Sequence, residues 1–177
     1  MFDPTIFDNL KVVIEGEVYD LDLTGDFLVT DRSDSIDIAN MSRRYKVSFR
    51  KRNHSLLIKG ADLSLKADLL NLSGELLSNK EIVPGCLVEI VFNLKLGNPE
   101  YHCPIIENQL KEVWGNRKIV QMVTYQYKNT DSRFDNKVYV SFDRLINEDH
   151  IDDLTEMITY ITQTLEVLNR IVNKRVQ

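Results

Sequence analysis

A chain of 177 residues, 43% of them hydrophobic and 28% charged, has the composition of a globular domain and is long enough to bury its own core. The formal net charge of −5 argues against general nucleic-acid binding, and two cysteines are too few for a disulfide framework. No apolar run approaches the ~20 residues of a membrane span, and the N-terminus does not look like a signal peptide. We therefore expect a cytoplasmic protein that binds no DNA and has no membrane span.

The N-terminal part of the chain predicts β structure. Residues 8–23 contain two short runs in which apolar and polar residues alternate, with Gly16 between them, and this pattern predicts two strands and a turn. Residues 27–30 predict a third strand. Residues 31–42 are polar and predict a loop, although two isoleucines in this stretch also fit the start of a strand.

Alternating apolar residues predict an antiparallel sheet in the middle of the chain. Residues 45–50 place Tyr, Val and Phe on one side and Lys, Ser and Arg on the other, as in a half-buried strand. Residues 63–77 alternate repeatedly and include a turn at Ser73-Gly74. Residues 87–94 form an apolar strand pattern after the turn signal Pro84-Gly85.

The following segments predict a short helix and a hairpin. Residues 97–104 predict a loop, and residues 105–114 have the apolar spacing of a helix, although their first two isoleucines also fit a strand. Residues 119–128 alternate cleanly. After a polar turn at 129–136, residues 138–142 predict the antiparallel partner of that strand.

The C-terminal residues predict a long helix that begins after the N-cap Asn147. Acidic residues crowd its first turns and basic residues its last turns, as the helix dipole favours. Its apolar residues recur at intervals of three and four and are Ile151, Leu154, Ile158, Ile161, Leu165, Leu168 and Val172. This stripe fits a coiled-coil seam between subunits and equally fits a helix packed across a sheet. Because a small barrel would cover only part of such a helix, we expect the side chains of its second half to lie bare and to join a homo-oligomer through residues 158–172.

Positive charge concentrates in one segment of this acidic chain. Seven Lys or Arg residues and no acidic residue lie between Asp37 and Asp62. Such a cluster indicates an anion site, because the planar guanidinium of Arg donates two parallel hydrogen bonds to phosphate. The alternative interpretation is a solvated edge strand whose charges prevent aggregation.

The sequence contains no catalytic constellation, and we expect no enzyme. The three histidines are scattered, and His102-Cys103 is the only close pair of metal-type ligands, which does not give a zinc spacing. Acidic residues near 143–153 are explained by the start of the helix. Glycine-rich phosphate loops and the G-x-S-x-G nucleophile motif are absent from the sequence.

The order of signals from Arg43 to about residue 165 resembles the PilZ domain, a bacterial receptor module for cyclic di-GMP. PilZ domains begin with an arginine motif, R-x-x-x-R, and continue after two strands with D/N-x-S-x-x-G. Here Arg43-Arg44-Tyr45-Lys46 stands at the first motif and Asn71-Leu72-Ser73-Gly74 at the second. The first motif is one residue short and ends in Lys, and the glycine of the second comes early. A second register, Asp62-Leu63-Ser64, also fits, but it leaves only 15 residues for the intervening hairpin.

This resemblance implies a fold and two alternative functions. It implies a small antiparallel PilZ-like barrel (41–146) followed by a C-terminal helix (147–177). With the strands predicted for residues 1–40, which lie outside the resemblance and form an N-terminal β extension, we expect an α+β fold that is mainly β. The first function is a signalling receptor for cyclic di-GMP, which needs no other cofactor; Arg43, Arg44 and Lys46 would bind the phosphates and guanines, and Asn71 and Ser73 the base edges. The alternative is an adaptor that binds no nucleotide and contacts a protein partner in motility, secretion or regulation.

Overall fold

The computed structural model describes residues 5–76, 83–128 and 132–173. Its helices and strands, in chain order, are α1 (Ile6–Leu23), β1 (Phe27–Asp37), β2 (Ser42–Lys51), β3 (Ile58–Ala67), α2 (Leu69–Leu76), β4 (Leu87–Leu96), α3 (Pro99–Trp114), β5 (Lys118–Thr124), β6 (Phe134–Ser141), the short 3-10 helix η1 (Glu148–His150) and α4 (Ile151–Asn173). The protein is therefore α+β, as expected. Parts of three predicted segments lie outside the described residues: the last residue of segment 63–77, the beginning of the turn at 129–136, and the chain after Asn173.

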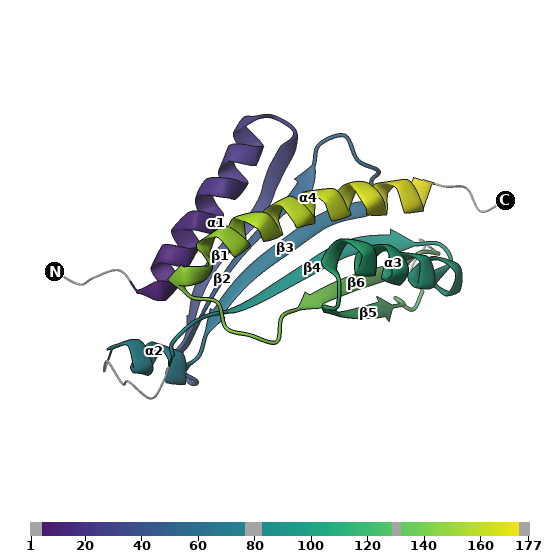
Figure 1. Cartoon of the computed structure of the whole chain (residues 1–177). Helices are drawn as coiled ribbons and strands as arrows, with labels where there is room; N and C mark the ends of the chain where they lie inside the picture. Colours follow the sequence, from purple (N-terminus) through teal and green to yellow (C-terminus); the bar gives the residue numbers. More distant parts are fainter. Residues whose placement is uncertain (1–4, 77–82, 129–131, 174–177) are drawn as a thin grey trace.

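The six strands form one antiparallel sheet in the order β1-β2-β3-β4-β6-β5. Helices α1, α3 and α4 cover one face of this sheet, which we call the helix face, and α2 lies at one end of the strands (Figure 1). The expected barrel is wrong. In the described part of the chain, β1 and β5 each pair with one neighbour only, so the sheet has two edges and stays open.

The core lies between the helix face and the three helices. Tyr45, Val47 and Phe49 of β2 are fully buried there, which confirms the predicted alternation of this strand. Strands β3, β4 and β6 bury alternate side chains in the same way, and α4 adds Leu154, Ile161, Leu165 and Leu168. Trp114 of α3 closes this core over Phe92, and its indole nitrogen donates to Thr164 Oγ1 of α4 at 2.9 Å.

The two strands expected in residues 8–23 are wrong, because this segment is the single helix α1. Thr5 caps the helix by accepting a hydrogen bond from the Asp8 backbone N–H. The buried side chains follow helical spacing and are Phe7, Leu10, Ile14 and Val18. Val12, which fitted the apparent alternation, is 65% exposed, and Gly16 lies on the exposed side of the helix rather than in a turn.

Three further segments differ from the expectation. Residues 31–37, expected as a loop, continue β1 along β2, and they are polar because β1 is an edge strand. Residues 69–76 form α2 instead of prolonging β3, and α3 begins at Pro99 rather than near residue 105. The expected hairpin of β5 and β6 is confirmed.

Helix α4 is confirmed, but its apolar stripe is not bare. Leu165 and Leu168 are fully buried within the single chain, and Val172 packs against the same core. The reason is that α1 and α3 flank α4 on the sheet, so these two helices and strands β2 and β3 together cover its apolar stripe. The argument for an oligomer joined through residues 158–172 is therefore lost.

Candidate functional site

The residues expected to bind a nucleotide are divided among three places. On β2 the side chains alternate, so Arg43 lies on the helix face, whereas Arg44 and Lys46 lie on the opposite face, which we call the open face. Asn71 and Ser73 lie on α2, at the end of the sheet (Figure 1). The five residues are therefore not gathered into one site.

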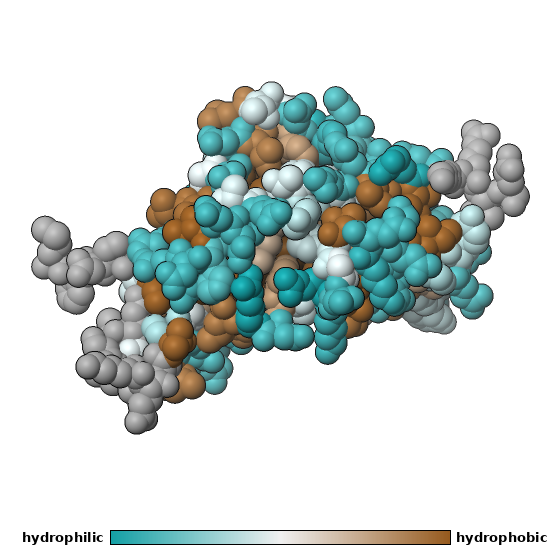
Figure 2. All heavy atoms as spheres, in the orientation of Figure 1, coloured by the Kyte–Doolittle hydropathy of each residue, from teal (hydrophilic) through white to brown (hydrophobic). Residues whose placement is uncertain are grey.

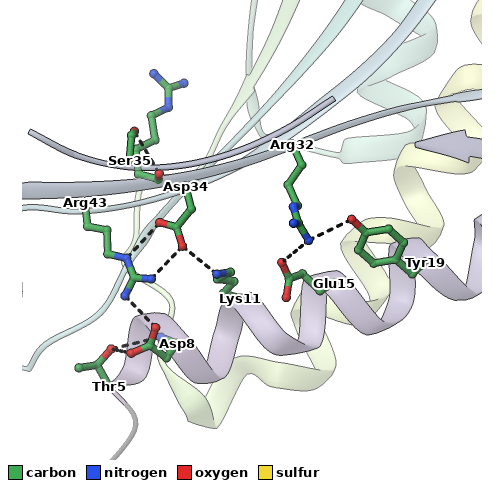
Figure 3. Close-up of polar contacts among 10 residues, drawn as sticks. Thr5, Asp8, Lys11, Glu15, Tyr19, Arg32, Asp34, Ser35 and Arg43 are labelled. Carbon is green, nitrogen blue, oxygen red and sulfur yellow. Dashed lines mark hydrogen bonds and ion pairs between the residues drawn. The ribbon is translucent and has the colours of Figure 1, made fainter. Parts of the chain in front are cut away.

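Arg43 lies at the centre of a polar network between α1 and the edge of the sheet (Figure 3). Its guanidinium donates to both carboxylate oxygens of Asp34, at 3.1 and 2.9 Å, and to Asp8 of α1 at 2.7 Å. Lys11 binds Asp34 from the helix side at 2.7 Å. The guanidinium carbon also lies 4.4 Å from the ring centre of Phe7. Arg43 thus joins α1 to β1, a role that already uses its planar fork.

The contacts of this network lower the pKa of two carboxyl groups, those of Asp34 and Asp8. The hydrogen bond from Arg43, aided by Lys11, outweighs burial and lowers the pKa of Asp34 to about 2. Burial alone would raise the pKa of Asp8, but hydrogen bonds from Thr5 and Arg43 are stronger together and lower it. Both carboxylates therefore stay ionised and hold α1 against the sheet down to acidic pH.

Arg44 and Lys46 are also paired, on the open face. Arg44 donates to Glu89 of β4 at 3.1 Å, and Lys46 contacts Asp31 of β1 at 2.9 Å. The strand register places Ser64 of β3 directly opposite Lys46. The alternative motif register, with Ser64 in place of Ser73, is thus the one that brings the polar residue beside the basic strand.

Asn71 and Ser73 have local structural contacts within and beside α2. The side-chain amide of Asn71 donates to Asp68 at 2.7 Å, and its oxygen accepts from the Gly85 backbone N–H at 3.2 Å. Ser73 Oγ donates to the Leu70 carbonyl at 3.2 Å. The bond from Gly85 ties α2 to the chain that leads into β4, and the other two bonds are local to α2.

The basic segment is explained by pairing with acidic residues that are distant in the sequence. Besides the pairs already described for Arg43, Arg44 and Lys46, ion pairs of this segment join Lys51 to Glu166, Arg52 to Asp22 and Lys59 to Asp135. Sequence reasoning missed these partners because none of them lies within the segment. The expected concentration of free positive charge is therefore largely neutralised by contacts within the chain.

The open face contains two shallow hollows of mixed polarity. One has a volume of about 310 Å³ and is lined by Arg44, Ser64, Lys66 and Glu89, among others. The other has a volume of about 400 Å³, and its charged lining residues are Asp31, Lys59, Asp62, Asp135 and Lys137. Acidic and basic side chains alternate around both hollows, so neither presents a field of one sign.

Next to the hollows, the open face becomes apolar toward β5. The register aligns Val91 of β4, Tyr139 of β6 and Val120 of β5 in one row across the sheet, and Met122 follows Val120 on the same side of β5. We call these four residues the apolar strip. Val120 is 43% and Met122 51% exposed. Sequence reasoning missed the strip because residues 119–123 carry apolar side chains on both sides of the strand, so the alternation does not show which side is exposed.

The helical side of the molecule has its own groove, between α3 and α4. It has a volume of about 520 Å³, and its lining includes Tyr101, Ile105, Val167 and Ile171 together with several polar residues. Figure 2 shows hydrophobic surface broken by polar residues where these two helices lie together.

Among the helices of the described residues, none combines the length and hydropathy needed to span a bilayer. Within the same residues, no group of three or more His, Cys, Asp or Glu side chains is placed to hold a metal ion. Neither family models nor curated proteins nor solved structures match this chain.

Proposed function

We propose that this chain is a non-enzymatic adaptor that binds a protein partner through the open face of its sheet. The observation that carries the proposal is the apolar strip, which leaves Val120 and Met122 about half exposed on the face opposite the helices. Exposed apolar side chains beside polar ones are typical of interaction surfaces on proteins. The partner belongs to motility, secretion or regulation if the PilZ resemblance holds.

The charged residues beside the strip support the same proposal. Arg44 with Glu89 forms an exposed pair beside Val91, at the border of the apolar surface. Lys46 pairs with Asp31 farther across the open face, toward β1. A polar border around an apolar centre orients a partner and excludes incorrect ones. Because both cations already have carboxylate partners, phosphate binding would have to displace them.

A photoreactive residue tests the adaptor proposal directly. Tyr139 lies in the middle of the strip, and a photoreactive phenylalanine of similar size at this position should cross-link to a protein other than the chain itself in cells that express it. The matched control carries the same residue at Val12, which is 65% exposed on α1. Equal cross-linking from both positions, or none from Tyr139, would contradict the proposal.

Cyclic di-GMP binding is the second candidate, and one observation favours it. The hollow of about 310 Å³ brings Arg44, Lys66 and Ser64 together on the open face. If the nucleotide binds there, calorimetric titration should give an affinity that falls with salt, and Arg44→Ala should weaken it by about tenfold through loss of a charge-assisted bond.

The same titration separates the two motif registers. Ser64→Ala should weaken nucleotide binding on the open face, while Asn71→Ala on α2 should leave it nearly unchanged. The opposite pattern would restore the motif at Asn71 and Ser73. If titration with cyclic di-GMP at high micromolar concentration gives no heat change, the adaptor is the candidate function that remains.

A further inference from the structure

The two edges of the sheet differ in their protection against pairing with another strand. On β1 the charged residues Asp31, Arg32, Asp34 and Asp37 and a register shift after Val29 interrupt the edge. On β5 the sequence Lys-Ile-Val-Gln-Met-Val-Thr contains one charge, at its first residue, and neither proline nor glycine. Charges and bulges are the usual means of blocking an edge, so β5 is an open edge and β1 is a blocked one.

Strand β5 is complementary to a second copy of itself. In an antiparallel pair centred on Gln121, Val120 stands opposite Met122 of the second copy, Ile119 opposite Val123, and Lys118 opposite Thr124. Every apolar residue then meets an apolar residue, and the single charge meets an uncharged residue. Paired side chains also lie on the same face of the sheet, so the apolar strips of the two copies become continuous.

The central residue of that pairing needs no new partner. The side chain of Gln121 donates to the Cys103 carbonyl at 2.7 Å and accepts from Asn136 at 3.0 Å. Both bonds lie within one chain and on the helix face. A second copy can therefore approach the edge of β5 without leaving a buried amide side chain unsatisfied.

We infer that two copies of this chain pair through β5, antiparallel and centred on Gln121, and so form one continuous sheet of both molecules. A twofold interface of this kind is closed, so assembly stops at a dimer. The inference is independent of the adaptor function, because the second copy occupies the edge of the sheet and the protein partner its open face.

Sedimentation and light scattering of the full chain give the first test. The expected mass is twice the 20.6 kDa of one chain. Val120→Lys is expected to weaken self-association at least about tenfold, because both copies lose an apolar contact. Val12→Lys on α1 is the matched control, and it should leave the dimer unchanged. A monomer at high micromolar concentration, or a dimer insensitive to Val120→Lys, would overturn the inference.

A mixed cross-linking experiment tests the register and does not depend on the stability of the lysine variant. Val120→Cys and Met122→Cys are prepared separately, each with Cys103 replaced by Ser, and then mixed under oxidation. Directly opposite residues have Cα atoms about 4.5–5.5 Å apart, which suits a disulfide, whereas residues offset by two positions are about 7–8 Å apart. The mixture should therefore cross-link, and each variant alone should not. Equal cross-linking in all three samples, or none in the mixture, would refute the proposed register.

Discussion

Arg43 connects α1 to the sheet by binding carboxylates on both elements, and Lys11 of α1 adds a second link to Asp34 of β1. It binds Asp8 and Asp34 together and packs over Phe7, with 23% of its side chain exposed. We expect Arg43→Ala to lower the free energy of unfolding by about 1–3 kcal/mol, because two partly buried carboxylates lose a charged donor. Urea unfolding measures the change.

The neighbouring Arg44 provides the matched control for this substitution. Its pair with Glu89 is about half exposed on both sides, so Arg44→Ala should cost less than about 1 kcal/mol. If the two alanine variants are equally stable, the network around Arg43 does not hold α1 in place.

Asp34 makes stability depend on pH in a defined interval. Its pKa is about 2 in the folded chain against an ordinary value of 3.8, so its ionised form favours the folded state above about pH 4. This contribution is lost as the pH falls from about 4 to 2. The Asp34→Asn variant should therefore have a lower free energy of unfolding than the parent protein near neutral pH. Between pH 4 and 2, its free energy of unfolding should fall by about 1 kcal/mol less than that of the parent.

Urea unfolding at a series of pH values tests this expectation. The control variant is Asp20→Asn, which removes an exposed carboxylate from α1 without touching the network. A parallel pH dependence of Asp34→Asn and the parent protein would show that Arg43 and Lys11 do not stabilise the charge of Asp34.

At the scale of elements, α4 is a part of the core of one chain. Leu165 is fully buried, and Leu165→Ala should cost about 2–5 kcal/mol through loss of contacts and the cavity that remains. Val172, near the end of the same helix, is only partly buried, and Val172→Ala should cost clearly less. Thermal or urea unfolding distinguishes them. Similar small effects at both positions would mean that the C-terminal half of α4 is loosely packed.

The sequence was most informative for elements with one buried face. Strands β2 and β4 and helix α4 were predicted because their apolar residues recur at the period of their own secondary structure. Helix α1 was missed because a short alternation that includes exposed Val12, followed by Gly16, has the local pattern of a hairpin. Local patterns of this kind are decided only by the tertiary packing of Leu10 and Ile14.

At the scale of the whole molecule, contacts distant in sequence determine both the open sheet and the candidate site. Closure of a barrel depends on which strands become neighbours, and α3 places the β5–β6 hairpin so that β5 lies at an edge. Likewise, Arg43 meets Asp8 across 35 residues and Arg44 meets Glu89 across 45. A cluster of cations is visible in the sequence, but the sequence does not show which carboxylates lie beside it in the fold.

The position of α4 at the end of the described chain has a consequence for protein synthesis. Strands β2, β3 and β4 can pair as consecutive hairpins as soon as they are made, but α4, which covers them, follows the last strand. At about 5–20 residues per second, the ribosome needs a few seconds to add the residues between Ser141 and Asn173. During that interval the apolar side chains that later meet α4 have no cover from it. A chain truncated after Ser141 and released from the ribosome should therefore bind a chaperone that recognises apolar segments, and the chain that includes α4 should not.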